Sequence, residues 1–157
     1  MKLFGPPAPV PHTLDWKVCL AGSIEMGAAV NWQDRVVDAL MKVENLAIFN
    51  PRRPDWDASW VQSIENQKFR EQVEWELKAL EEADLIAMHF EPETKSPITL
   101  LELGLYARDH RQMVVHCPEG YWRKGNVDIV CKRYNVKMVK TMDGMIEEIV
   151  RVTKHFA

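Results

Sequence analysis

The chain has 157 residues, of which 46% are hydrophobic and 27% are charged, proportions typical of a globular protein with one sizeable core. Its formal net charge of −3 argues against non-specific binding to nucleic acid, and every apolar run is shorter than the roughly 20 residues of a membrane-spanning helix. We therefore expect a cytoplasmic protein that contacts neither nucleic acid nor membrane.

The first 16 residues carry four prolines and lack the apolar core of a signal peptide. We interpret residues 1–16 as an extended Pro-rich arm and residues 17–157 as the domain. Cys19, Cys117 and Cys131 are odd in number and lack the spacing of a metal site. Reduced thiols are therefore the expected state, and no metal is expected.

Short apolar runs alternate with longer amphipathic segments along the rest of the chain. In chain order, the pattern predicts a strand at 17–22, a helix at 32–43, a strand at 46–50, a helix at 61–83, a strand at 84–90, a helix at 96–110, a strand at 112–117, a helix at 126–135, a strand at 136–141 and a helix at 142–156. Ser96 is the expected N-cap of its helix, and Pro97 suits the first helical position.

Alternation of strands and helices predicts a parallel sheet covered on both faces. The predicted strands are nearly continuous apolar runs, as strands buried on both faces should be. We therefore expect a three-layer, flavodoxin-like α/β domain whose five-stranded parallel sheet has the order 2-1-3-4-5. Ligands of such sheets bind beyond the carboxyl ends of the strands, which selects the loops 22–31, 50–60, 91–96 and 117–126.

Glu102 is the one charged residue in the run SPITLLELGLYA, residues 96–107. Thr99 and Tyr106 share its helical face, and a buried carboxylate there would be costly unless it were paired or hydrogen-bonded. It could point into the ligand crevice or lie on the helix surface, and spacing alone does not distinguish the two.

Glu76, in the segment VEWEL, is a second candidate, although helical periodicity groups it with a solvated acidic face. The segment AGSIEMG lacks the spacing of a dinucleotide or phosphate loop, yet Gly22 and Ser23 could still present backbone N–H groups and a hydroxyl. His89 and His116 end predicted strands and are compatible with core histidines. A carboxylate nucleophile with a helper acid suits glycosyl transfer through a covalent intermediate.

Several segments, in their order and spacing, resemble the nucleoside 2-deoxyribosyltransferase family in its shorter bacterial and phage-like branch. They are VCLAGSIE, NWQ, FNPRRPDWD, QVEWEL, ADLIAMHF, SPITLLELGLYA and YWRKGNVDIVCKRY, and they span about Lys17 to Lys140. The resemblance implies exchange of the base of 2'-deoxynucleosides through a covalent deoxyribosyl-enzyme. Some relatives transfer the sugar to water instead.

The resemblance also implies residue roles. Glu102 matches the nucleophile, and Glu76 matches the acidic residue, usually Asp, that binds and protonates the base. Gly22 and Ser23 match the loop that lines the sugar pocket. Asn126 matches an Asn that reaches into the neighbouring subunit's site to hold the sugar 5'-hydroxyl. Small-molecule nucleosides and nucleobases are therefore the expected partners of a homodimer or larger homo-oligomer.

The chain departs from the family pattern at two positions. Ser96 replaces an Asp six residues before the nucleophile, and Ser23 and Ile24 stand where some members have a Tyr after the first strand. Base recognition can therefore differ. The candidates in the next loop are Asn50, Arg52, Asp55, Trp56 and Asp57, with Trp56 either stacking on a base or serving as a packing anchor.

Three functions are compatible with these residues. The first is deoxyribosyl transfer; the second is N-glycoside hydrolysis of a nucleoside or nucleotide, for which Ser23, Ser96 and Arg123 could clamp a 5'-phosphate. The third is a nucleotide sensor without catalysis. No metal or organic cofactor is expected, because an ester between sugar and enzyme carries the chemistry. Tyr121 and Trp122 are expected as an exposed aromatic anchor of the subunit interface.

Overall fold

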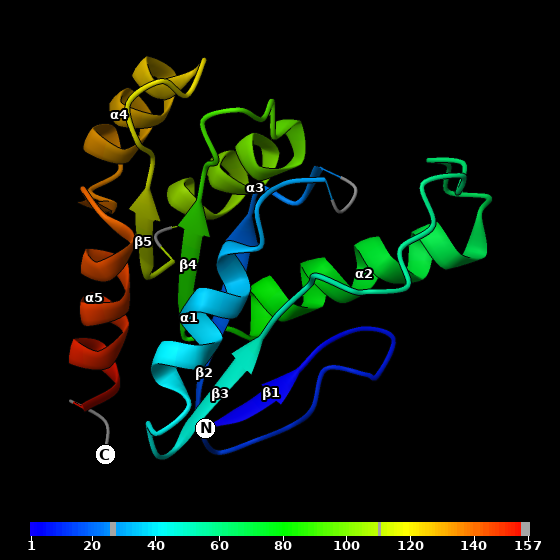
Figure 1. Cartoon of the computed structure of the whole chain (residues 1–157), viewed down its shortest axis with the longest axis horizontal. Coiled ribbons are helices and arrows are strands. Elements are labelled where there is room, and N and C mark those ends of the chain that lie inside the picture. The colour runs from blue at the N-terminus through cyan, green and yellow to red at the C-terminus, as the bar shows by residue number, and fades with distance from the viewer. Residues whose placement is uncertain (26–27, 110, 155–157) are drawn as a thin grey trace.

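The computed structural model describes residues 1–25, 28–109 and 111–154 as six parallel strands and five helices (Figure 1). The strands are β1 (Lys2–Phe4), β2 (Trp16–Gly22), β3 (Leu46–Phe49), β4 (Leu85–His89), β5 (Met113–His116) and β6 (Lys137–Val139). Their order in the sheet is β1-β3-β2-β4-β5-β6. Within the described ranges, none of the helices has both the length and the apolar character that a membrane crossing requires.

The expected number of five strands is wrong, because the first residues of the chain add a sixth. In β1, Lys2 to Phe4 pair with Ala47 to Phe49 of β3, at the edge of the sheet. A three-residue strand is too short to give a periodic signal, and the prolines that follow it favoured an extended arm. The α/β class and the parallel sheet are confirmed, and the five predicted strands keep their expected order.

The helices are α1 (Trp32–Leu40), α2 (Gln67–Glu82), α3 (Pro97–Arg108), α4 (Lys124–Arg133) and α5 (Met142–Lys154). Helix α2 begins six residues later than predicted, where the side chain of Asn66 accepts a hydrogen bond from the N–H of Phe69. Helix α4 begins two residues earlier, so Asn126 lies inside its first turn. The predicted helical positions 110, 155 and 156 lie outside the described residues.

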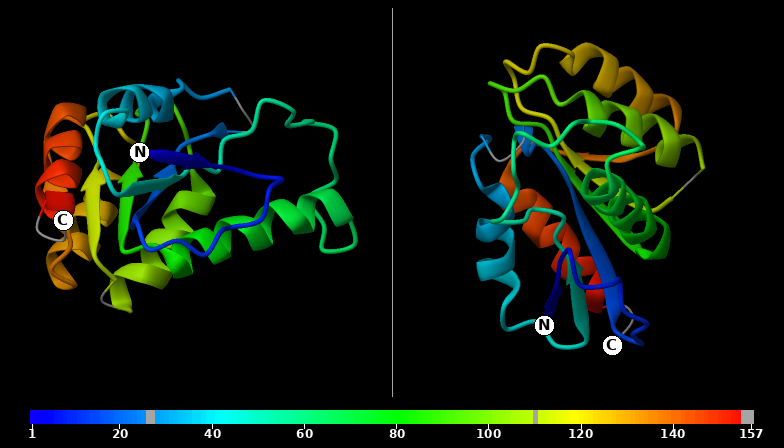
Figure 2. Two further views of the ribbon diagram at one scale, coloured as in Figure 1. Left: turned by 90° about the horizontal axis from the view of Figure 1, so that it is seen from below. Right: turned by 90° about the vertical axis from the view of Figure 1, so that its right-hand side faces the viewer.

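Successive side chains of the strands enter two separate cores, one on each face of the sheet. Helices α2, α3 and α4 cover one face, and α1 and α5 cover the other (Figure 2). In β2, for example, Cys19 and Ala21 pack in the first core, whereas Val18 and Leu20 pack in the second. The near-continuous apolar strands are thus explained by burial on both sides.

Candidate active site

Three buried hydroxyls meet beyond the carboxyl ends of β2 and β4. The Oγ of Ser23 lies 2.5 Å from the Oγ of Ser96 and 3.0 Å from the Oγ1 of Thr94, and the last two oxygens are 2.7 Å apart. Ser23 also accepts a hydrogen bond of 2.8 Å from the N–H of Glu91, and Thr94 donates one to the carbonyl of Glu91. We call Ser23, Thr94 and Ser96 the hydroxyl cluster.

Ser96 occupies the N-cap position of α3, as predicted, but its side chain does not cap the helix. Its backbone has a left-handed φ of 46°, and its hydroxyl joins the hydroxyl cluster instead. The N–H of Ser96 donates a 2.6 Å hydrogen bond to the carboxylate of Glu25. The N-terminus of α3 therefore lies beside the hydroxyl cluster and already binds one carboxylate, that of Glu25.

Gly22 allows the end of β2 to pass close to β4. It has a φ of 145°, and a Cβ at this position would lie 2.2 Å from the carbonyl oxygen of His89. The N–H of the next residue, Ser23, donates to that same carbonyl. Glycine is therefore required here for the backbone path that brings Ser23 to the hydroxyl cluster.

Glu102 lies on the buried face of α3, together with Thr99 and Tyr106, and is only 8% exposed. Burial, together with the charge of Glu76, raises its pKa from 4.5 to about 8. The alternative of a helix-surface position is therefore wrong. A carboxyl group with such a pKa carries its proton over much of the neutral range until another group stabilises its ionised form.

Glu76 of α2 lies close enough to Glu102 for its charge to raise the pKa of Glu102. Burial raises its pKa, and a 2.7 Å hydrogen bond from the side chain of Gln72 partly opposes that rise. Beneath the two carboxylates, Cys19 of β2 has a pKa raised by burial, by Glu102 and by Glu76. The grouping of Glu76 with a solvated face is wrong, because Glu76 is half-buried and burial raises its pKa.

The loop between β3 and α2 holds the other predicted base-binding residues, and most of them are engaged within the loop. The Oδ1 of Asn50 accepts from the N–H of Arg52, and Asp55 forms an ion pair of 2.6 Å with Arg53. The ring of Trp56 is half-buried, 5.0 Å from that of Trp60. These contacts describe a loop that is packed largely on itself.

The loop between β5 and α4 approaches from the other side. Tyr121 is buried, contrary to expectation, and donates to the carbonyl of Lys95, as does the indole of Trp122. Trp122 is 47% exposed, and the side chains of Lys95 and Arg123 lie 4.4 Å and 4.3 Å from its ring centroid. Asn126 is exposed on α4 and is not brought to the carboxylates of its own chain by any contact among the described residues.

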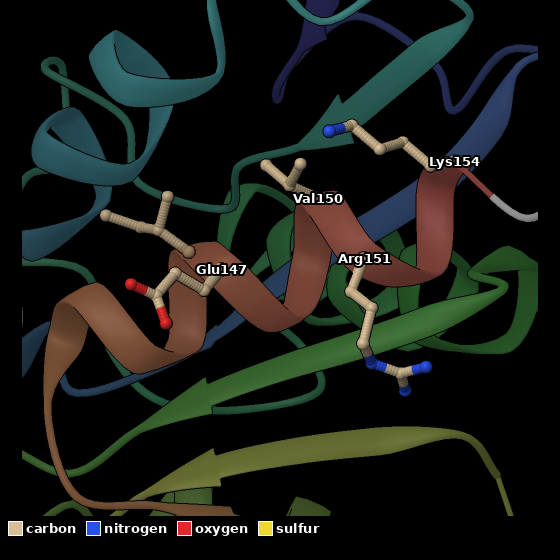
Figure 3. Close-up of a pocket in the computed structure, with 5 residues that line it drawn as sticks. Glu147, Val150, Arg151 and Lys154 are labelled. Atoms are coloured by element: carbon tan, nitrogen blue, oxygen red, sulfur yellow. The ribbon is translucent and has the colours of Figure 1, made fainter.

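Sequence reasoning missed Thr94, Glu25, Gln72 and Arg53. All four are polar residues in loops or on a helix, with no periodic signal to mark them. The hollow drawn in Figure 3, of ≈ 390 Å³, lies along α5 on the opposite face of the sheet from Glu102. Its lining residues are Ile146, Glu147, Val150, Arg151 and Lys154. Neither Glu76 nor Glu102 lines this hollow.

Comparison with known proteins bears on this arrangement. A family model described as nucleoside 2-deoxyribosyltransferase like matches residues 15–121. The chain belongs to this family. The family resemblance noted in the sequence is therefore confirmed. The matched residues include Glu76, Glu102 and the hydroxyl cluster, and they end before Asn126.

Two solved structures share the fold of this family member. A conserved protein from Enterococcus faecalis V583 superposes with a TM-score of 0.60 at 12% identity, over 91% of this chain and 99% of that one. The Clostridium botulinum CMP N-glycosidase superposes with a TM-score of 0.52 at 14% identity, over 85% of this chain and 97% of that one. No curated protein matches the chain significantly in sequence. Family membership supports an enzyme that acts on N-glycosidic bonds by transfer or hydrolysis.

Proposed function

We propose that this protein is a nucleoside 2-deoxyribosyltransferase, which cleaves the N-glycosidic bond of a 2'-deoxynucleoside and passes the sugar to another base. The observation that carries the proposal is a pair of neighbouring carboxylates: Glu102 is buried on α3, Glu76 is half-buried on α2, and the charge of Glu76 raises the pKa of Glu102. Each has a raised pKa, and one proton shared between them supplies both an acid and a nucleophile.

The proposed reaction has two displacement steps at C1' of the sugar. In the singly protonated pair the raised pKa of Glu102 keeps the proton on Glu102, so this proton first passes from Glu102 to Glu76. The ionised Glu102 oxygen then bonds to C1' while the bond from C1' to the base nitrogen breaks, and Glu76 gives its proton to the departing base. In the second step a nitrogen of the incoming base bonds to C1', Glu102 leaves with its electron pair, and Glu76 takes up the proton that the base loses. Water in place of the second base would give hydrolysis.

The length of α3 fits a sugar held at both ends. Ser96, at the N-cap of α3, and Glu102, in the second turn, are six residues apart, which corresponds to a rise of roughly 9 Å along the helix axis. The hydroxyl cluster can therefore bind the 5' end of the sugar while Glu102 reaches C1'. Gly22 contributes the close backbone, and Asn50, Asp55 and Trp56 lie in the loop proposed to contact the base.

A specific feature favours a second candidate, hydrolysis of a nucleoside 5'-monophosphate. The hydroxyl cluster and the cations Lys95 and Arg123 lie around the start of α3, where a phosphate could take the N–H of Ser96 by displacing the carboxylate of Glu25. Hydroxyls, a helix N-terminus and cations together can bind a phosphate. The shared fold of the CMP N-glycosidase is compatible with this alternative.

We further propose that the working unit is a homodimer formed through the outer face of α3. Ile98, Leu101 and Leu105 follow one another along this face and are 57%, 59% and 51% exposed. Gly104 lies among them with open space where a Cβ would be, which permits close helix packing. Because the inner face of α3 is also apolar, its apolar outer face is expected to be buried against a second copy of the chain. Asn126 on the adjacent α4 would then act in the partner's site.

Incubation with deoxyinosine, with and without free adenine, tests the proposed reaction. Deoxyadenosine in the presence of adenine indicates transfer, whereas hypoxanthine alone indicates hydrolysis, and a parallel incubation with deoxyinosine 5'-monophosphate tests the second candidate. Glu102→Ala should lower the rate at least about tenfold, because it removes a covalent nucleophile. Glu74→Ala, on the exposed face of α2, is the matched control and should keep the rate. If no base is released from any of these substrates, the proposed reaction is wrong and the non-catalytic nucleotide sensor is the remaining hypothesis.

The dimer has its own test. Glu102→Ala and Asn126→Ala, each inactive alone, should regain part of the activity when mixed under conditions of subunit exchange. A mixed dimer then contains one site with both Glu102 and Asn126 intact. A heterodimer without activity would assign Asn126 to its own subunit, and a fully active monomer would remove the proposal.

A further inference from the structure

Gln72 makes a direct contact with the proposed acid and is itself held on two further sides. It lies one turn before Glu76 on α2 and is only 3% exposed. Its Nε2 donates to the Oε1 of Glu76 at 2.7 Å and to the carbonyl of Pro51 at 3.0 Å, and its Oε1 accepts from Arg53 at 3.4 Å. A buried amide with all of these groups paired is a fixed element of the structure.

The contacts define which way the amide points. Both Nε2 protons go to oxygen acceptors, one on Glu76 and one on Pro51, while the Oε1 faces the guanidinium of Arg53. A flipped amide would set its oxygen against two other oxygens and its N–H groups against a cation, so it is disfavoured. Glu76 therefore always receives a donor from this side.

Arg53 connects the amide to the loop between β3 and α2. Its guanidinium forms two hydrogen bonds with Asp55, of 2.7 Å and 2.6 Å, and lies 5.2 Å from the ring centroid of Trp60. Together with the bond from Gln72 to the carbonyl of Pro51, this arrangement ties the carboxylate of Glu76 to the loop proposed to contact the base.

We infer that Gln72 is a positioning residue for Glu76: it binds Oε1 and so leaves Oε2 to carry the proton toward the departing base. The inference rests on the proposed role of Glu76 in base protonation. In this inference Gln72 fixes the orientation of the Glu76 carboxyl group, and Arg53 fixes the orientation of the Gln72 amide.

The inference has a measurable electrostatic consequence. An N–H donor stabilises the ionised form of Glu76 and so opposes the rise of its pKa by burial. Glu102 of α3 and Cys19 of β2 interact electrostatically with Glu76, and neither group supplies a positive charge. Removing the donor should therefore raise the pKa of Glu76, and both ionisations of the carboxylate pair should move upward.

Gln72→Met tests this, because methionine has nearly the same length and no N–H. Gln67→Met is the matched control: Gln67 also donates to a carboxylate four residues later, Glu71 at 2.8 Å, but both side chains are exposed. The titration of the Glu76 carboxyl carbon, followed by NMR, should move up by about one pH unit in Gln72→Met and stay in place in Gln67→Met. The bell-shaped pH profile of base release should move the same way.

Gln72→Glu provides a second variant that keeps the side-chain length should methionine prevent folding. It replaces the donor with a second carboxylate beside Glu76, so its titration should move further than that of Gln72→Met. An unchanged or lowered titration of Glu76 in a folded Gln72 variant overturns the inference. The NMR titration needs no turnover, so the inference and the proposed function fail separately: an inactive protein with a shifted Glu76 contradicts only the function.

Discussion

Replacing Glu102 with glutamine should change how the stability of the fold depends on pH. Burial and the charge of Glu76 raise the pKa of Glu102 from 4.5 to about 8. Between these values the unfolded chain has lost the proton and the folded chain still holds it, so the free energy of unfolding falls as pH rises. At about 1.4 kcal/mol per pKa unit, the difference between 4.5 and about 8 corresponds to about 5 kcal/mol above pH 8.

Chemical denaturation of the wild type and Glu102→Gln over this pH range measures the effect. Glutamine has the same size and no titration, so the difference between the two free energies of unfolding isolates Glu102. The variant should gain up to about 1.4 kcal/mol per pH unit relative to the wild type until the difference levels off near the folded pKa. Stability curves that stay parallel would refute the desolvation of Glu102.

Three further predictions follow from the contacts. Gly22→Ala should destabilise the fold by about 3 kcal/mol or more, measured by urea denaturation, because its Cβ would lie 2.2 Å from the carbonyl of His89 at a φ of 145°; a loss below about 1 kcal/mol would contradict the close approach. Trp75→Phe should speed proteolysis of the Pro-rich arm, because it removes the 2.7 Å hydrogen bond from the indole to the carbonyl of Ala8, and an unchanged cleavage rate would argue against this attachment. The native protein should leave all three buried cysteines unreactive toward a thiol reagent at mildly alkaline pH, since burial raises the pKa of each, and full reaction should require denaturant.

Most of the sheet could be predicted because its information is local. Strands buried on both faces read as apolar runs, and parallel strands need helical crossovers, so the alternation along the chain gave the class and the order of five strands. The first strand could not be predicted in this way. Lys2, Leu3 and Phe4 join the sheet through backbone pairing with β3, and nothing in three residues signals that pairing.

The site was partly predictable for a similar reason. Glu102 stands out as a single charge in an apolar helix, whereas Glu76 sits among other acidic residues and only the resemblance separated it from them. The hydroxyl cluster joins Ser23 to Thr94 across 71 positions, and Gln72 looks like any polar residue on a helix. Contacts of this kind depend on the tertiary structure, which no local periodicity contains.

Glu76 and Glu102 restrict each other's protonation. If both were ionised, like charges would face each other in a desolvated space; if both were protonated, neither could act as a nucleophile. Only the singly protonated pair contains an acid and a carboxylate at once. The charge of Glu76 is one of the two causes that raise the pKa of Glu102, so each ionisation makes the other harder and the two steps separate along the pH scale. The singly protonated pair is consequently populated over a wider pH range than two independent carboxylates of equal pKa would allow.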